Sequence, residues 1–161
     1  MRTNRRFEDS GLSIHSFLSI PILVVCPRCS KCARVAKTLQ ISQQTCPSWN
    51  STVTCLNCGF AKSIKLSNYY TVPNGLKEPL DPFLQLPLWL QAPCAGNILW
   101  ALNYEHLSYL QDLTQATLRQ RTHLVSWQNT SLASRLPKWL TAASNREFIL
   151  QAIQKLRLKE C

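Results

Sequence analysis

Two Cys-x-x-Cys pairs constrain this chain more than any other feature. Cys26 and Cys29 lie in the run CPRC, and Cys55 and Cys58 lie in the run CLNCG. A turn of this length can bring two thiolates onto one ion, and four thiolates are a preferred ligand set of structural zinc. The residues therefore predict one structural Zn²⁺ held by these four cysteines, within a β-ribbon over residues 18–66. Because four thiolates leave no open position for water, such a site supports folding rather than catalysis.

The turns themselves fit this interpretation. Pro27 has the fixed φ that suits a tight turn, and Gly59 follows the second pair, where a positive φ is convenient.

Four further cysteines leave alternatives open: Cys32, Cys46, Cys94 and Cys161. CPRCSKC with the later Cys46 is similar to an iron–sulfur pattern, but the gap after Cys32 is far longer than in ferredoxins. A second zinc that also uses Cys94 and His106 is another alternative. We interpret Cys32, Cys46 and Cys94 as thiols without a ligand role, and expect Cys161→Ser to leave both the metal and the ribbon unchanged.

The fold class predicted is α+β. Residues 1–17 are polar and indicate a flexible tail, residues 18–66 form the ribbon, and residues 67–85 are rich in turn formers and indicate a linker. Residues 86–161 are predicted to form a β-hairpin packed with about three helices. The sequence thus predicts a metal-bearing unit followed by a second, separate unit.

Local patterns predict the elements of these units. They are a strand over 17–25, hairpin strands near 86–91 and 97–102, a helix over 104–121 capped by Asn103, helical turns over 131–142 interrupted at Pro137, and a last helix whose capping box is Ser144 and Glu147 and whose apolar face is Phe148, Ile149, Ala152, Ile153 and Leu156.

Charge indicates the class of partner. The chain has 18 Lys and Arg against 8 Asp and Glu, a net charge of +10, which one zinc with four thiolates lowers to about +8. A basic excess favours polyanions, with nucleic acid (DNA or RNA) first, and residues 26–66 contain no acid. The candidate nucleic-acid-binding residues are Arg28, Lys31, Arg34, Lys37, Phe60, Lys62 and Lys65.

Other function classes are weaker. The tryptophans, Trp89 and Trp100 among them, would suit a protein-interaction surface, so an adaptor is the main alternative. A Cys94 nucleophile near His106 is the only enzyme reading, and no catalytic constellation or nucleotide-binding motif supports it. Nothing in the pattern indicates a membrane anchor or a small-molecule substrate.

The N-terminal region imitates a signal peptide only loosely. Basic residues precede an apolar stretch over 14–25, but Glu8 and Asp9 lie before it and Pro21 interrupts it. We therefore expect a cytoplasmic protein, in whose reducing environment Cys-x-x-Cys pairs bind metals.

Three stretches carry a resemblance to a known family. CPRC and CLNCG resemble the zinc ribbon of transcription factor IIB, and residues 87–107 and 131–150 resemble short bacterial zinc-ribbon proteins, some of which bear the name of the primosomal restart helicase PriA. The resemblance implies a zinc-binding module of transcription, replication or repair. It implies no helicase motor, since the chain lacks a G-x-x-x-x-G-K-[ST] loop. Ser30 departs from the family pattern, which has glycine after the second cysteine.

Overall fold

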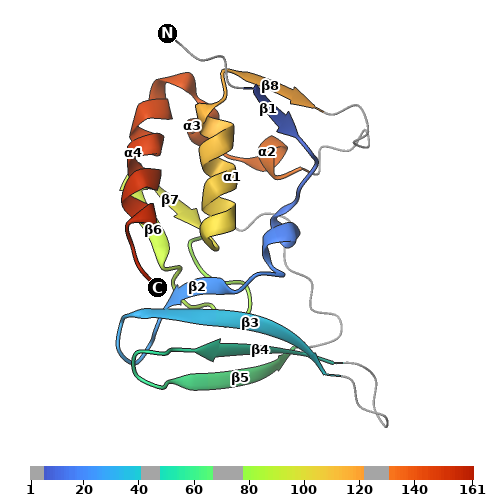
Figure 1. Ribbon diagram of the computed structural model, residues 1–161, viewed down its shortest axis with the longest axis vertical. Coiled ribbons are helices and arrows are strands. Elements are labelled where there is room, and N and C mark those ends of the chain that lie inside the picture. Colours follow the sequence, from blue (N-terminus) through green and yellow to red (C-terminus); the bar gives the residue numbers. More distant parts are fainter. Residues whose placement is uncertain (1–5, 41–47, 67–77, 122–130) are drawn as a thin grey trace.

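The computed structural model describes residues 6–40, 48–66, 78–121 and 131–161 (Figure 1). Antiparallel strands and helices combine there in a mixed α+β architecture, as predicted. Its elements, in order, are β1 (Arg6–Asp9), η1 (Ile14–Phe17), β2 (Ile22–Val25), β3 (Cys32–Gln40), β4 (Ser48–Thr54), β5 (Ala61–Leu66), β6 (Leu90–Cys94), β7 (Asn97–Ala101), α1 (Tyr104–Gln115), β8 (Leu118–Arg121), α2 (Leu132–Arg135), α3 (Lys138–Thr141), η2 (Ala143–Asn145) and α4 (Arg146–Arg157).

The cysteine pairs belong to a four-stranded antiparallel sheet in the order β2-β3-β4-β5. Alternating side chains give it two different faces. Val35 of β3 pairs with Val53 of β4, and both are buried, whereas the neighbouring Thr52 and Ser63 lie on the opposite, polar face. The predicted strand over 17–25 is shorter in the structure. It begins at Ile22, after Pro21, which has no N–H to offer to a ladder.

The hairpin of β6 and β7 confirms the predicted hairpin, but its first strand is Leu90–Cys94 rather than residues 86–91. Leu90 pairs with Ala101, and Cys94 pairs with Asn97 across the two-residue turn. Ala95 and Gly96 in that turn have φ values of 48° and 73°. Two positive φ values in succession match the twist of the flanking strands.

Helix α1 begins as predicted but ends early. The Asn103 side chain accepts a hydrogen bond from the backbone N–H of His106 at 3.0 Å, which confirms the cap. The predicted continuation to residue 121 is wrong, because Leu118–Arg121 instead pair in parallel with Arg6–Asp9. Pairing with a strand far away in sequence has overridden the local helical pattern.

This pairing also changes the interpretation of the N-terminus. The sequence predicts a flexible tail over 1–17, yet residues 6–17 form β1 and η1. Phe7 is buried with its ring edge-on to Tyr109 at 5.4 Å between centroids. The Ser131 hydroxyl donates to the Asp9 carboxylate at 2.6 Å. Phe7 and Asp9, two alternate residues whose side chains are buried, therefore hold this segment in place. Its polar composition does not indicate this burial.

The last helices follow the sequence with two exceptions. Pro137 separates α2 from α3, and four of the five predicted face residues of α4 are buried. Phe148, however, is 60% exposed. The capping box is also wrong, because η2 precedes α4 and the Asn145 side chain caps no N–H of α4, donating instead to the Trp139 carbonyl at 2.9 Å.

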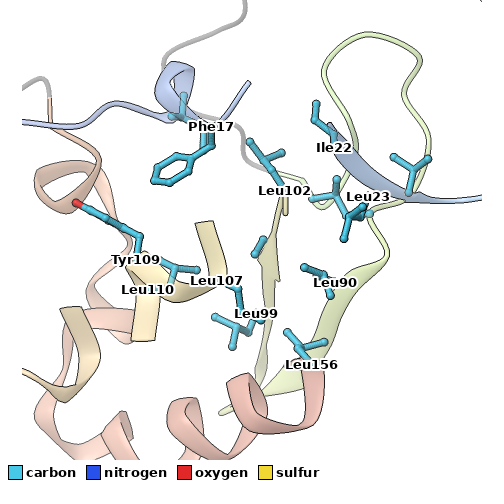
Figure 2. Close-up of a cluster of buried hydrophobic side chains, with 14 of the residues drawn as sticks. Phe17, Ile22, Leu23, Leu90, Leu99, Leu102, Leu107, Tyr109, Leu110 and Leu156 are labelled. Atoms are coloured by element: carbon cyan, nitrogen blue, oxygen red, sulfur yellow. The ribbon is translucent and has the colours of Figure 1, made fainter. Parts of the chain in front are cut away.

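A leucine-rich core joins the helices to the hairpin (Figure 2). Leu99 of β7, Leu107 of α1 and Leu156 of α4 are each at most 1% exposed. Strand β2 contributes Ile22 and Leu23 to the same cluster. Strand β2 thus packs both with the cysteine-bearing sheet and with the second unit.

Backbone hydrogen bonds make the same connection. The Leu23 N–H donates to Leu102 at 2.8 Å, and the Leu23 carbonyl accepts from the Trp89 N–H at 2.9 Å. Val25 donates to Pro87 at 2.8 Å. The two units therefore meet along β2.

The predicted linker over 67–85 is partly outside the described residues, since the structure describes it only from residue 78. There, fully buried Asp81 organises a turn: its carboxylate accepts from the N–H groups of Phe83, Leu84 and Leu86 at 2.7–3.0 Å. Within the described ranges, no helix has the length and apolar character needed to cross a membrane.

Candidate metal centre

Two matching turns position the four predicted cysteines. In the first, the Ser30 N–H donates to the Cys26 carbonyl at 2.9 Å. In the second, the Gly59 N–H donates to the Cys55 carbonyl at 3.0 Å. Ser30 and Gly59 have φ values of 57° and 71°, so both turns need a left-handed residue after the second cysteine. Only the second turn has the glycine that adopts this conformation without strain.

The strand ends close each turn. The Cys26 N–H donates to the Lys31 carbonyl, and the Cys55 N–H donates to that of Phe60, both at 2.8 Å. These bonds join the end of β2 to the start of β3, and the end of β4 to the start of β5. The sheet thereby brings the two turns face to face.

The four thiol sulfurs form one compact group. All four Sγ atoms lie within 4.8 Å of one another. The Sγ atoms of Cys26 and Cys58 are 3.7 Å apart, and those of Cys29 and Cys55 are 3.6 Å apart. A tetrahedron with metal–sulfur distances of about 2.3 Å has edges of about 3.8 Å. The cluster is thus positioned to bind one metal ion.

Neighbouring groups donate to the sulfurs. The backbone N–H of Arg28 donates to Cys26 Sγ at 3.4 Å, and the Asn57 side chain reaches across from the other turn to Cys29 Sγ at 3.5 Å. Donors of this kind stabilise thiolate over thiol. Asn57 also ties the two turns together.

The same environment gives the thiols of Cys29 and Cys58 very different pKa values. A backbone hydrogen bond from Lys31 is the main cause that lowers the pKa of Cys29 to about 6. For Cys58, a backbone hydrogen bond from Phe60 acts to lower the pKa, but burial and the adjacent thiols outweigh it and raise the pKa to about 12. If all four thiols ionised at this distance, their charges would need a cation, which a divalent ion bound at this position would supply.

The remaining cysteines behave differently from the prediction in one case. Cys32 forms a disulfide with Cys161, so its interpretation as an idle thiol is wrong. Cys94 is a buried free cysteine whose pKa is raised by burial, which matches an inert packing role. Cys46 lies outside the described residues. In the ranges that the structure describes, the four-cysteine cluster is the only group of metal-ligand type.

The predicted basic residues are divided between the faces of the sheet. Arg34 and Lys65 are on the polar face with Thr52, as the strand register requires, and the Arg34 guanidinium donates to the Cys161 carbonyl at 3.5 Å. Lys37 is on the other face, with its ammonium 4.2 Å from the centre of the Trp49 ring. Lys31 is exposed in the first turn.

Three of the predicted residues come together. Arg28, Phe60 and Lys62 line one hollow of about 490 Å³, immediately beside the cysteine turns. Its remaining lining residues are Pro27, Val53, Leu84 and Leu86.

The sequence did not indicate that Leu84 and Leu86 form a wall of this hollow, because residues 67–85 indicated a linker and Leu86 the start of a hairpin strand. Asp81 followed by Pro82 was the available signal, since Asp side chains often cap the N–H groups that follow them in a turn. That turn presents the two leucines to the hollow.

No protein-family model, curated protein or solved structure matches this chain significantly. What the cluster and its surroundings do must therefore be read from these residues.

Proposed function

We propose that the cluster holds one structural zinc ion in a ribbon that presents a nucleic-acid-binding surface. Four thiolates at tetrahedral spacing support zinc, although iron can take the same ligand set. Elemental analysis of protein from metal-balanced medium is expected to give about one zinc per chain. If the analysis instead found about one iron per chain, with the visible absorption of a ferric thiolate, the metal would be iron rather than zinc.

The observation that carries nucleic-acid binding is the hollow lined by Arg28, Phe60 and Lys62. Two cations at one opening can pair with successive phosphates, and a half-buried aromatic ring offers a face to an unpaired base. Apolar walls suit the base, while the cations suit the backbone. The absence of acidic residues from 26–66 leaves this attraction unopposed.

A single-stranded nucleic acid fits this arrangement better than a duplex, because a base that stacks on Phe60 cannot remain paired with a base of the opposite strand. We therefore expect tighter binding to single-stranded than to double-stranded DNA, with RNA tested in parallel. Fluorescence anisotropy with labelled 20-mers across a salt series measures both preferences. Each phosphate contact on a single strand contributes a slope of about −0.7 in log K against log salt.

Matched variants locate the interface. The double variant Arg28→Gln with Lys62→Gln is expected to flatten the salt slope by about 1.4, since it removes two phosphate contacts. Phe60→Leu is expected to weaken binding by about 1–3 kcal/mol without changing the slope. The double variant Lys138→Gln with Lys155→Gln, which removes two exposed charges from α3 and α4, is the charge-matched control. Equal binding by all four proteins would place the interface elsewhere.

A protein adaptor is the alternative, and one residue favours it. Leu56 lies at the tip of the second cysteine turn and is 88% exposed. An apolar side chain held out by a rigid metal-bound turn suits a protein pocket better than a phosphate backbone. If nucleic acid does not bind at any salt concentration, crosslinking from position 56 in the native cell becomes the decisive experiment. Both versions of the proposal place the protein in a reducing cytoplasm, which keeps the four clustered thiols free for a metal and in which the Cys32–Cys161 disulfide would be open to reduction.

A further inference from the structure

A second, larger cavity lies in the helical unit. It has a volume of about 600 Å³, within the range typical of small-molecule sites. Its walls come from β7, α1, α2 and α3 rather than from the cysteine-bearing sheet. The lining residues on which the argument depends are Trp100, His106, Arg135, Leu136 and Trp139.

His106 gives this cavity a polar point. The ring is only 2% exposed and stacks on Phe17 with centroids 4.9 Å apart. Its Nδ1 atom accepts a hydrogen bond from the Leu102 N–H at 3.2 Å, so in the neutral ring the proton is on Nε2. Burial lowers the pKa of His106 to about 3 and keeps the ring neutral.

Among the described residues, the Nε2–H group has no hydrogen-bond partner. A buried donor left unpaired is costly, and such groups commonly mark a missing ligand or water. His106 is one of the residues that line the cavity, and its buried Nε2 atom would be satisfied by an acceptor that reaches it from there. Glu105, its neighbour in sequence, is exposed rather than buried beside the ring.

We propose that this cavity binds a small aromatic carboxylic acid, whose carboxylate accepts from His106 Nε2 and whose ring packs between Trp100 and Trp139. The lining is mainly apolar, and the two indoles suit a flat ring. Arg135, exposed at the rim, adds the positive charge that favours an anion over a neutral compound. The site is independent of the metal and of nucleic-acid binding.

The test uses the full chain and 2-naphthoate as the probe. Titration calorimetry and the fluorescence of the tryptophans are expected to report one site per chain. Naphthalene-2-methanol, with the same rings but no carboxylate, is expected to bind at least tenfold more weakly. Equal affinities for the two compounds would overturn the proposal, as would no binding of 2-naphthoate at millimolar concentration.

Variants identify the residues responsible. His106→Phe keeps a flat buried ring and removes the donor, and it is expected to weaken 2-naphthoate binding about tenfold. Arg135→Gln is expected to cost about threefold to tenfold, and it does not depend on a buried replacement that could disturb folding. Leu136→Trp is expected to fill the cavity and abolish binding.

Lys138→Gln removes an exposed charge on α3 that does not line the cavity, and it is the control for Arg135→Gln. Thermal melts confirm that each variant folds. Unchanged 2-naphthoate affinity in folded Arg135→Gln and Leu136→Trp would place the probe outside the cavity and overturn the proposal. Nucleic-acid binding by Arg135→Gln is expected to remain at the wild-type level, so the two proposals can fail separately.

Discussion

The two units of this protein are held together by different means. Among the described side chains of β3, β4 and β5, the buried apolar ones are Ala33, Val35, Val53 and Leu66. The hairpin and helices, in contrast, bury a continuous set of leucines and isoleucines from β6, β7, α1 and α4. Outside β2, the sheet therefore buries few apolar side chains, whereas the second unit has a conventional core.

The difference teaches where each unit is vulnerable. If the four sulfurs hold an ion, as we propose, the sheet would depend on that ion, whereas the helical unit depends on close packing. Because β2 belongs to both, its hydrogen bonds from Leu23 and Val25 would then connect a metal-dependent unit to a metal-independent one. Removing the metal should therefore affect the molecule unevenly.

The largest expected effect comes from Cys55→Ser. Metal binding by a four-thiolate structural site contributes about 10 kcal/mol or more to folding, and the three remaining thiolates would not hold the ion as tightly. Metal content is expected to fall to near zero, and amide protection in β3–β5 to be lost while that in α1 and α4 persists. Hydrogen exchange measured by mass spectrometry reads both regions at once. Cys94→Ala, which changes a buried cysteine outside the cluster, is the control. Equal loss of amide protection in both units of Cys55→Ser would contradict the comparison.

The reverse asymmetry is expected for Leu107→Ala. This side chain is fully buried on α1, so its truncation is expected to lower the free energy of unfolding by about 2–5 kcal/mol. Urea titration measures the loss, and zinc content is expected to stay unchanged. Leu158→Ala, at a position 78% exposed, is expected to change stability by about 0.5 kcal/mol or less.

Acid is expected to weaken the helical unit through His106. Its pKa is about 3 when folded, below the ordinary 6.5 of the unfolded chain. The unfolded state therefore binds the proton first, and stability is lost as pH falls below about 6.5, at about 1.4 kcal/mol per pH unit. Urea unfolding of wild type at pH 7.5 and 5.5 is expected to differ by about 1.4 kcal/mol more than that of His106→Phe. An equal pH response in the two proteins would refute this assignment, and His15→Gln serves as the exposed control.

The smallest effect distinguishes the two cysteine turns. Ser30→Gly is expected to strengthen metal retention, and Gly59→Ser to weaken it, each by about 1 kcal/mol. A Cβ at Gly59 would meet no atom within 4 Å, so only backbone conformation is tested. Competition with a chelator measures the metal affinity of each variant. If both variants changed the affinity in the same direction, the conformation of the residue after the second cysteine would not be what sets metal retention.

The sequence predicted those features that depend on local chemistry. The cysteine turns, the Asn103 cap and the Ala95–Gly96 hairpin each follow from a few adjacent residues. Pairings between distant segments were missed, namely β1 with β8 and the Cys32–Cys161 bond. No local pattern encodes the partner of such a segment. The Asp81 turn was missed because Pro and Asn indicate irregular backbone without indicating what surrounds it.

The Cys32–Cys161 disulfide has a consequence for how the molecule can come apart. Its two cysteines are 129 positions apart, and the resulting covalent ring contains Cys55 and Cys58 but excludes Cys26 and Cys29. A bound ion would therefore fasten the N-terminal arm to this ring from outside. A chelator would then remove the link that the ion makes between the arm and the ring, and a reductant would open the ring. After both treatments, the backbone hydrogen bonds of Leu23 and Val25 in β2 would be the remaining connection between the sheet and the second unit.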